Sequence, residues 1–548
     1  MKTNRRIFIL AFFVLTLAAS WKLLLQHWGA FPFNADEAIV ALMARHILQG
    51  ERPLFFYGQA YMGSLDAYLV AAGFALLGQH VWVIRAIQMI LYTGTLATTV
   101  ILGALVLRST QSGIYAAALL AIPAVNMTLY TTVSLGGYGE ALLIGNLVLI
   151  CATCLVNRLT QTQREVYPQK QAALWAGLWG LFSGLGLWAN GLTLIYVIPS
   201  AVVIWWNLIH NFPGARIVAL GTALPACIGL GAGSFPWWLF ALQNEPANLV
   251  RELLGSAVSV EQGSLLARSG AHLVNLALLG FPAMLGLRPP WEVRWLALPL
   301  LPIGLAFWLA TGIFALRRCA TLPRADAGWM LPGTAAALLA GFLFTSFGVD
   351  PSGRYFIPLY LILALAAGKM LVDKVHALPL RIGLALVVIL FNTWGTVQSM
   401  LTSRTGITTQ FDQSTVVDHS VDAELIRFLH AQDEKFGYTT YWISYPLAFL
   451  SQEELIYVPR LPYHQDFRYT PRDDRYGPYR DIVTAAPRAA YITAQQPELE
   501  DYLVRAFEGR HITWDEAQIG DYHVYYRLSE KVTPEEIGLG VVSTGIKP

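Results

Sequence analysis

Long apolar runs separated by short polar segments fill the first 400 residues of the chain, and the pattern changes after residue 400. Most of these runs are long enough for an α-helix to cross a bilayer, which takes roughly 17–25 apolar residues. They predict about eleven membrane spans: one ending at 25, then 81–107, 114–130, 138–156, 172–188, 192–208, 217–235, 295–316, 329–347, 355–372 and 382–397. The expected fold class for residues 1–400 is therefore a mostly α, polytopic membrane domain.

The basic residues between these runs set the expected orientation. Lys2, Arg5 and Arg6 precede the first span, so the positive-inside rule places the N-terminus in the cytoplasm. The run "GSLDAYLVAAGFALLG" is short for a crossing and carries an aspartate, so we expect a helix lying in the outer interface. Every inner connection then carries Lys or Arg, whereas the short outer ones, "TTVSLGG" and "ANG", carry none. This predicts a multi-pass protein of the plasma (inner) membrane with an external C-terminus.

The N-terminal stretch "MKTNRRIFILAFFVLTLAAS" also has the basic start and apolar core of a cleaved signal peptide. Its apolar run continues to Leu25, which is long enough to span. The interpretation that we favour is an uncleaved first span.

Residues 401–548 have more charge and no long apolar run. Helical patterns, "DAELIRFLHAQ" and "ELEDYLVRAFEG", alternate with short β-rich stretches, "YTTYWISY", "LIYVP", "AAYITA" and "DYHVYYRLS". This alternation predicts a small external α/β domain at 401–548, following the membrane domain at 1–400. It lacks the G-x-G-x-x-G of a dinucleotide site.

Composition supports the membrane assignment. The chain is 55% hydrophobic and 13% charged, with a mean hydropathy of +0.48, which excludes an ordinary soluble domain. The basic residues are dispersed, so no nucleic-acid partner is expected. Cys151 and Cys154 form a C-x-x-C pair inside an apolar helical run, where we interpret them as packing residues.

An acidic pair, Asp36 and Glu37, follows the first span in "FPFNADEAIVALMARHILQG". Apolar residues at helical spacing predict an amphipathic helix at the outer surface, with Asn34 as its N-cap and Glu37 completing a capping box. Acidic residues in a first turn also complement the helix dipole. Helix capping thus explains why Glu37 occurs at its position and partly explains Asp36. A functional role for the pair is the alternative.

Polar and aromatic residues gather in the next outer segment, "FFYGQAYMGSLDAY". Tyr57, Gln59, Tyr61 and Asp66 suit a sugar or a lipid headgroup, but tyrosine is also an ordinary interfacial anchor. Asp66 alone could interact with the dipole of the short helix that it begins.

Further candidates lie at the outer mouths of later spans. Tyr138 and Glu140 begin the fourth span in "SLGGYGEALL", and Asn190 lies in "LWANG". A carboxylate at the mouth of an apolar helix is costly unless it is paired or hydrated. These residues are candidate substrate contacts, and a helix-start acid in the dipole is the alternative for Glu140.

Arg354 and Tyr355 begin the tenth span in "DPSGRYFIP". A guanidinium binds phosphate bidentately, and this position is at headgroup depth, so both residues are candidates for donor-phosphate binding. The alternative is plain snorkelling of the arginine. The segment "LPYHQDFRYTPRDDRYGPYRD" is interpreted as a solvated loop or a cover for an acceptor.

The chain resembles the GT-C superfamily of membrane glycosyltransferases, in the bacterial group similar to protein O-mannosyltransferases and aminoarabinose transferases. The resemblance rests on "NADEAIVALMARHILQGERPLFFYGQAYMGSLDAYLVAAGFALLG" and on "RYFIP" late in the membrane domain. It implies transfer of a sugar from a polyprenyl-phosphate donor to a lipid, glycan or protein acceptor on the outer face, with Asp36 as catalytic base and Glu37 beside it. Aminoarabinose transferases carry an E-K-P stretch after this helix, which this chain lacks, so no lysine–phosphate contact and no metal ligand is carried over. A divalent cation is left open.

Two other function classes compete with the enzyme. A lipid or solute transporter or flippase would place ionisable residues near mid-membrane on broken, repeated helices, and a non-catalytic scaffold would need no converging polar groups. The enzyme hypothesis instead predicts one cavity between the two domains, lined by Asp36, Glu37, Tyr138, Glu140 and Arg354.

Overall fold

The computed structural model describes residues 2–162, 169–211, 216–243, 246–255, 263–410, 416–464, 467 and 469–540. The chain forms two compact units, and each combines segments that are distant in sequence. The helical unit comprises Met1–Trp28, Ala60–Asp66 and Ile84–Thr402, and the α/β unit comprises Gly29–Gln59, Ala67–Val83 and Ser403–Pro548. The C-terminal α/β region is thus joined by two segments of the first 83 residues.

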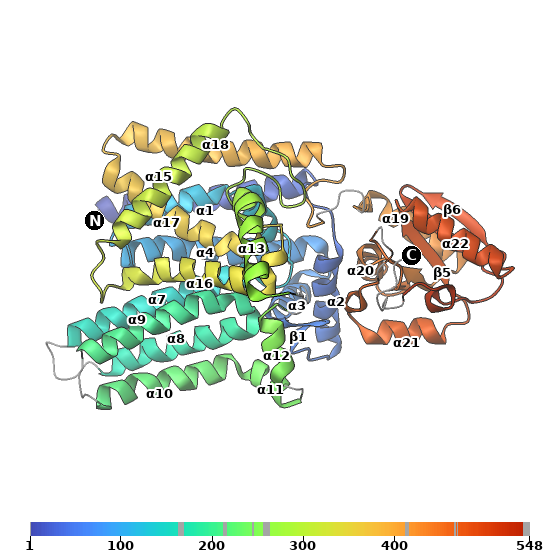
Figure 1. Cartoon of the computed structure of the whole chain (residues 1–548), viewed down its shortest axis with the longest axis horizontal. Coiled ribbons are helices and arrows are strands. Elements are labelled where there is room, and N and C mark those ends of the chain that lie inside the picture. Colours follow the sequence, from blue (N-terminus) through green and yellow to red (C-terminus); the bar gives the residue numbers. More distant parts are fainter. Residues whose placement is uncertain are drawn as a thin grey trace. The chain divides into compact units, whose positions relative to one another are not determined.

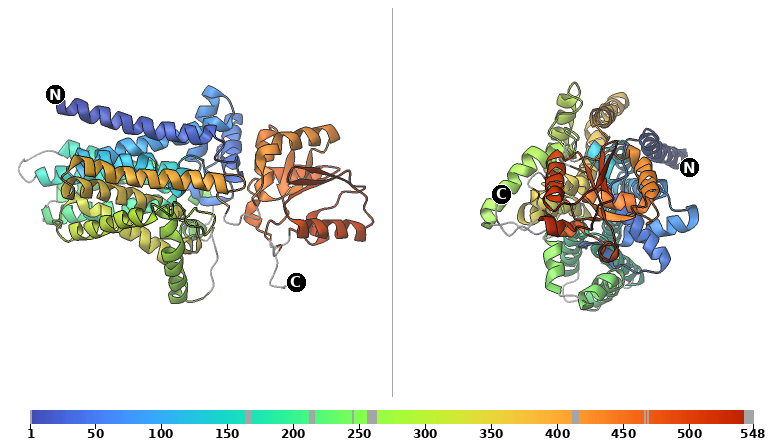
Figure 2. Two further views of the ribbon diagram at one scale, coloured as in Figure 1. Left: turned by 90° about the horizontal axis from the view of Figure 1, so that it is seen from above. Right: turned by 90° about the vertical axis from the view of Figure 1, so that its right-hand side faces the viewer.

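Long apolar helices build the helical unit, and Figure 2 shows that they run roughly side by side. Its helices are α1 (Lys2–His27), α4 (Val81–Leu105), α5 (Thr110–Ala121), α6 (Val125–Tyr130), α7 (Tyr138–Thr162), α8 (Gln169–Ala189), α9 (Leu194–Asn211), α10 (Arg216–Gly233), α11 (Phe235–Gln243), α12 (Pro246–Leu253), α13 (Leu265–Asn275), α14 (Phe281–Met284), α15 (Leu301–Cys319), α16 (Met330–Phe344), α17 (Ile357–Lys374) and α18 (Leu378–Thr402). Within this unit α8 packs between α7 and α10, and α16 packs along α9 (Figure 1).

Nine of the described helices are long and apolar enough to cross a membrane, or ten if one bent pair is a single span. The expected polytopic helical domain is confirmed, although two of its eleven expected spans are not continuous helices. The expected span 114–130 is two short helices, α5 and α6, because Pro123 between them has no backbone N–H to donate. The expected span 217–235 ends in a 62° bend between Leu220–Gly233 and Phe235–Gln243.

Many apolar side chains on the long helices point outward rather than into a core. Phe12, Leu224 and Leu316 are each more than half exposed, and this is typical of helices that face lipid. Helix α3 (Leu65–Leu77), with 13 residues, is only about 20 Å long at 1.5 Å per residue. It is shorter than the roughly 30 Å hydrocarbon core of a bilayer.

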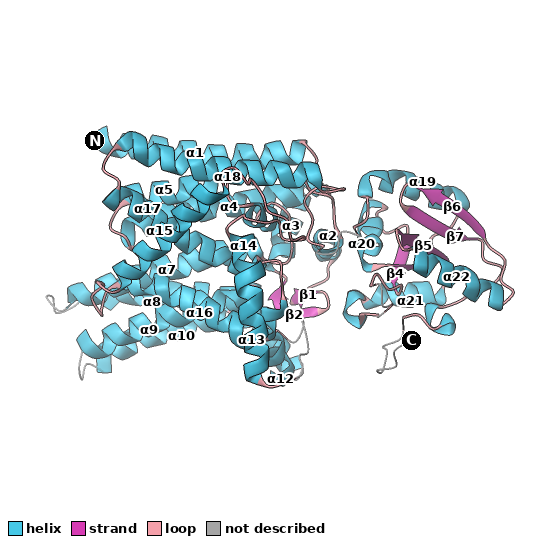
Figure 3. Cartoon of the chain, turned by 45° about the horizontal axis from the view of Figure 1, so that its top comes forward, coloured by secondary structure: helices cyan, strands magenta, loops and turns pink. Residues whose placement is uncertain are grey.

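The α/β unit is built on one mixed sheet with the strand order β4-β3-β5-β7-β6, and Figure 3 shows these strands in magenta. Its elements are α2 (Ala35–Gln49), β1 (Phe55–Phe56), β2 (Gln59–Gly63) at the border of the units, α19 (Asp422–Gln432), β3 (Phe436–Thr439), α20 (Tyr441–Leu450), β4 (Ile456–Pro459), α21 (Gly477–Ala485), β5 (Ala490–Ala494), α22 (Pro497–Gly509), β6 (Asp515–Ile519) and β7 (Tyr522–Tyr526). β3 is parallel to both β4 and β5, while β7 is antiparallel to β5 and β6. Buried Leu425, Leu429, Tyr457 and Ile492 belong to the core against the sheet.

Two expectations for this unit were wrong in detail. The stretch "YTTYWISY" is not one strand, because β3 ends at Thr439 and α20 begins at Tyr441. Helix α2 is not a surface helix with one apolar face, because side chains around its whole circumference are buried, including those of Val40 and Arg45 as well as Ile39. Helix α20 packs against α2, and Phe449 of α20 stacks on Phe74 of α3.

Candidate functional site

Asp36 lies in the first turn of α2, where the sequence places the helix start. Asn34 caps the helix by accepting the Glu37 backbone N–H at 3.0 Å. Asp36 is half-buried, and the Tyr441 hydroxyl donates to its Oδ1 over 2.5 Å. Glu37 has no exposed surface. Of the acidic pair, Asp36 is therefore the residue with exposed surface.

Arg475 belongs to the same unit and is close enough to Asp36 to interact with it electrostatically. With its amide oxygen facing the guanidinium, Gln59 accepts from both Nη1 and Nη2 of Arg475 at 2.8 Å. The guanidinium carbon is 5.5 Å from the centre of the Tyr441 ring. Gly58 has a φ of +74°, and a Cβ there would come within 2.9 Å of the Arg475 Cδ, so only glycine suits this turn. Gln59, a predicted substrate contact, is thus a hydrogen-bond partner of Arg475.

Asp473 completes a charged cluster around Arg475. Burial raises the pKa of Asp473 to about 7, because the charge of Arg475, which favours ionisation, offsets the desolvation only in part, and the neighbouring Asp36 opposes ionisation. Burial by itself disfavours the charged form of Arg475, but Tyr441 and the two carboxylates together raise its pKa above the ordinary value. One guanidinium therefore balances two acidic groups.

Tyr57, another predicted substrate contact, belongs to a network that fastens α2. Its hydroxyl donates to Glu51 at 2.8 Å and lies 2.9 Å from Nδ1 of His46, whose Nε2 is 2.9 Å from Glu453. Arg45 and Tyr479 also bond to Glu453, at 3.3 and 2.7 Å. Burial alone would raise the pKa of Glu453, but the hydrogen bonds from His46 and Tyr479 and the charge of Arg45 hold it at about 2.

In the helical unit, several side chains pin the segment that carries Arg354. Asn126 donates to the carbonyl of Gly353 at 3.0 Å, Asn275 donates to that of Gly348 at 2.7 Å, and Arg288 donates to that of Pro351. Gly353 has a φ of +77°, and a Cβ there would lie 2.9 Å from the Cβ of Ala283. The turn before α17 is therefore fixed on three sides.

Arg354 emerges from this turn among aromatic rings. It forms an ion pair with Asp350 at 2.6 Å and lies over the ring of Tyr355, 5.0 Å from its centre. Tyr138 is close enough to interact electrostatically with Arg354, and it packs edge-on against Tyr130 at 5.1 Å. No described residue bonds to Nε of Arg354 or to the buried Tyr355 hydroxyl. Both groups keep donors that a bound anion can use.

An apolar cavity of about 230 Å³ opens beside this cluster, between α9 and α16. Three residues predicted from the sequence line it: Tyr61, Asn190 and Tyr355. Its remaining wall is almost wholly apolar: Gly191, Leu192, Leu194, Ile195, Ile198, Leu253, Leu254, Ala337, Leu338, Gly341, Phe342, Thr345 and Phe347. Asn190 also holds the structure here, since it donates to the carbonyl of Gly136 at 3.2 Å and accepts from the backbone of Leu192 at 2.9 Å.

Asp66 and Glu140 come together, but in a closed and buried cluster. Asp66 accepts hydrogen bonds from Gln88 at 3.0 Å and from Ser134. Glu140 is buried next to Asp66, and no described residue bonds to its carboxyl oxygens. The pair joins α3, α4 and α7 and is shielded from substrate.

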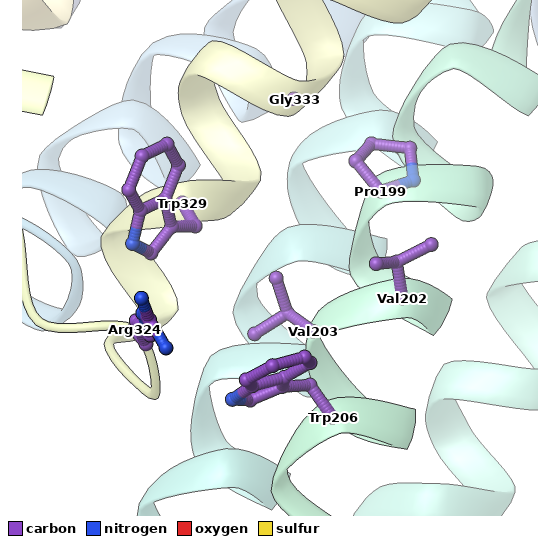
Figure 4. A pocket seen from close by; sticks show the side chains of 7 residues that line it. All are labelled: Pro199, Val202, Val203, Trp206, Arg324, Trp329 and Gly333. Carbon is purple, nitrogen blue, oxygen red and sulfur yellow. The ribbon is translucent and has the colours of Figure 1, made fainter.

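A second cavity, of about 430 Å³, lies at the other end of the seam between α9 and α16 (Figure 4). Trp206, Val203 and Pro199 face Trp329 across it, and Arg324 supplies its one charged side chain. Without converging polar groups it offers no chemistry. The cavity next to Arg354 has polar lining residues and is the candidate site.

A divalent cation does not fit the groups that the structure describes. In the described parts of the chain, no three His, Cys, Asp or Glu side chains come together as metal ligands. Of the buried carboxyl groups Asp66 and Glu140, Asp66 is already occupied by the donors Gln88 and Ser134.

Sequence reasoning missed Tyr441, Asp473 and Arg475. The stretch that carries Asp473 and Arg475 was interpreted as a solvated loop, yet Asp473 is buried. Gln465, Asp466 and Arg468 of the same stretch lie outside the described residues. The usable signal was the density of charged and aromatic residues in "DDRYGPYRD". Asp36 and Glu37 belong to one unit and Tyr138, Glu140 and Arg354 to the other, so their common cavity stays a prediction.

Comparisons with known proteins bear on the whole chain. No family model and no curated protein sequence matches it. ArnT from Cupriavidus metallidurans bound to undecaprenyl phosphate is similar in structure, with a TM-score of 0.56 and 12% identity, over 93% of this chain and 97% of that one. The apo oligosaccharyltransferase of Archaeoglobus fulgidus gives a TM-score of 0.51 and 13% identity, over 91% of this chain and 71% of that one. AglB from the same organism, in complex with an inhibitory peptide and a dolichol-phosphate, gives a TM-score of 0.50 and 12% identity. This match covers 96% of this chain and 74% of that one. The chain therefore has the fold of these GT-C membrane glycosyltransferases.

Proposed function

We propose that this chain transfers a sugar from a polyprenyl-phosphate donor to an acceptor hydroxyl at the outer face of the plasma membrane. The observation that carries the proposal is the apolar cavity lined in part by Tyr355, whose ring lies next to Arg354, in a chain with the GT-C fold. A polyprenyl-phosphate sugar has a long apolar tail and an anionic head, and this arrangement offers an apolar cavity with a cation nearby. The sugar and the acceptor are not specified by these residues.

Arg354 suits the leaving group of the reaction. When the bond between the anomeric carbon and the phosphate oxygen breaks, its electron pair stays on the phosphate, and the negative charge on the polyprenyl phosphate increases. A guanidinium with an unpaired Nε and the nearby Tyr355 hydroxyl can donate to that charge as it develops.

Asp36 suits the acceptor side. A neutral hydroxyl is a poor nucleophile, and a carboxylate that takes its proton speeds transfer by roughly 100- to 10,000-fold. The acceptor oxygen then bonds to the anomeric carbon, the proton moves to Asp36, and polyprenyl phosphate leaves. Asp36 is assigned this role because it has exposed surface, whereas Glu37 does not.

Donor binding can be tested without knowing the sugar. We expect undecaprenyl phosphate to raise the thermal midpoint of the purified full chain more than undecaprenol does, because only the former has an anion for Arg354. In Arg354→Gln this advantage should shrink, with affinity for the phosphate falling roughly tenfold or more. Equal stabilisation of the wild type by both lipids would contradict the assignment of Arg354.

The tail site has its own matched pair of variants. Gly341 lines the apolar cavity and has open space at its Cβ position, so Gly341→Leu should fill the cavity without a clash. Gly383 in α18 is also open, and it lies outside the lining of this cavity. We expect Gly341→Leu to weaken binding of both lipids and Gly383→Leu to leave it unchanged. If Gly383→Leu weakens lipid binding and Gly341→Leu does not, the lipid tail does not bind in this cavity.

A further inference from the structure

The C-terminal region brings two of its loops to Asp36. Strands β3, β4 and β5 are parallel, and the carboxyl ends of parallel strands are where open α/β sheets place functional groups. Tyr441 follows the end of β3 after a single residue, and the stretch with Asp473 and Arg475 follows β4. The segments that carry Tyr441 and Arg475 therefore both start from the carboxyl ends of the parallel strands.

Tyr441 fixes one oxygen of the Asp36 carboxylate. Its side chain is 4% exposed, and its hydroxyl donates to Oδ1 over 2.5 Å. No described residue bonds to Oδ2. The hydrogen bond thus selects one orientation of the carboxylate and leaves the second oxygen available to a hydroxyl.

Arg475 is held in place independently of Asp36. Gln59 accepts from both of its Nη atoms, and its backbone N–H donates to the Tyr445 hydroxyl at 2.6 Å. The same hydroxyl donates to the backbone carbonyl of Asp473 at 2.7 Å. A fixed positive charge therefore faces Asp36 and Asp473, and it offsets the repulsion between two nearby carboxyl groups.

We propose that Tyr441 and Arg475 are positioning residues for Asp36, so that the C-terminal region is part of the catalytic machinery rather than an appendage. The proposal rests on the proposed function, since it assumes that Asp36 accepts the proton. Tyr441 orients the carboxylate through a hydrogen bond, and Arg475 holds a fixed positive charge near it. Because a base that rotates freely loses the advantage of its placement, both contributions act on the chemical step.

The test measures release of undecaprenyl phosphate from an undecaprenyl-phosphate sugar in proteoliposomes, with an extract of the native envelope as the source of acceptor. Tyr441→Phe keeps the ring and removes only the hydroxyl. We expect kcat to fall roughly ten- to hundredfold, as for the loss of a hydrogen bond to a charged group, with KM for the donor unchanged.

Tyr457→Phe is the matched control. Tyr457 of β4 is buried to a similar degree, and its hydroxyl donates to the carbonyl of Glu434 at 2.9 Å rather than to Asp36. It should lower the thermal midpoint as much as Tyr441→Phe does while leaving kcat near the wild-type value. Equal kcat values for the two variants, or a change in KM alone for Tyr441→Phe, would overturn the positioning role.

Arg475→Lys provides a second measurement if Tyr441→Phe does not fold. A lysine keeps the charge but cannot donate two parallel hydrogen bonds to Gln59, so kcat should fall less than in Arg475→Gln. Equal kcat in both variants and the wild type would also overturn the proposal. Asp36→Asn distinguishes failure of the proposed base from failure of the positioning role. If Asp36→Asn keeps full turnover, Asp36 is not the base. If Asp36→Asn loses turnover but the Tyr441 and Arg475 variants do not, only the positioning role is refuted.

Discussion

At the scale of single residues, the most informative group beside the proposed base is Asp473. It shares Arg475 with Asp36, and burial makes it the carboxyl group that holds its proton up to a pH of about 7. A neutral Asp473 adds no negative charge next to the base. An ionised Asp473 competes with Asp36 for the same guanidinium. The state of Asp473 therefore sets how much of the charge of Arg475 acts on Asp36.

Replacing Asp473 by asparagine should change how stability depends on pH. The pKa of Asp473 is about 7 in the folded chain and 3.8 ordinarily, so the folded state binds the proton more tightly. That contribution is fully present below about pH 4 and is lost as the pH rises to about 7. We expect the thermal midpoint of Asp473→Asn, relative to wild type, to rise between pH 4.5 and pH 8. The exposed Asp481 of α21 supplies a control, Asp481→Asn, and a flat difference for both variants would contradict the assignment.

Residue roles were predictable from the sequence only where they are local. Asn34 as the cap of α2 follows from a pattern within four consecutive positions, and the structure confirms it. Tyr441 is 405 residues from Asp36, and nothing within one helical turn of either residue indicates the other. Tyr57 and Gln59 were recognised as unusual, but their partners, His46 and Arg475, become evident only in the folded chain.

At the scale of elements, the anchoring of α2 decides where Asp36 lies. Helix α2 packs along α20, Arg45 lies over the ring of Phe449 at 4.7 Å, and Glu453 receives hydrogen bonds or charge from three side chains. The carboxylate of Glu453 thus links α2 to α20 through hydrogen bonds and an ion pair. It contributes stability above about pH 4.5, and this contribution is lost as the pH falls towards 2.

Glu453→Gln should loosen α2 without removing any apolar contact. It takes away the charge that balances the buried Arg45, a loss of about 1.5–3 kcal/mol for hydrogen bonds to charged groups. We expect amide hydrogen exchange in 35–50 to speed up by tenfold or more in this variant. Glu454→Gln changes the neighbouring exposed glutamate and should leave exchange as it is. If Glu453→Gln exchanges as slowly as wild type, the network does not hold α2.

Element prediction succeeded where the apolar pattern was long and regular, and it failed where one residue changes the backbone. Pro123 divides an apolar run into α5 and α6 because the helix cannot continue hydrogen-bonding through it. The edge strand β6, "DEAQI", was missed because its side chains are polar and largely exposed, so it has no apolar alternation. Helix α20 was taken for a strand because Tyr, Trp and Ile are also frequent in sheets.

At the scale of the whole molecule, hydropathy alone predicted a helical membrane region followed by an α/β region, and the structure and its GT-C neighbours agree. The sequence did not predict that two segments of the first 83 residues join the C-terminal region in one compact unit. Such long-range contacts depend on the packing of α2 and α3 against α20, which no local pattern encodes.

Turnover of a lipid-linked sugar decides whether this chain is a transferase with Asp36 as its base. The full chain is reconstituted in proteoliposomes with a panel of undecaprenyl-phosphate hexoses and pentoses and an extract of the native envelope. Mass spectrometry then follows conversion of each donor to undecaprenyl phosphate and movement of each donor between leaflets. We predict that the wild type consumes one donor and that folded Asp36→Asn does so roughly 100- to 10,000-fold more slowly. Full turnover by Asp36→Asn would show that Asp36 is not the base. Movement of donors between leaflets with no sugar transferred would show that the chain is a transporter rather than a transferase.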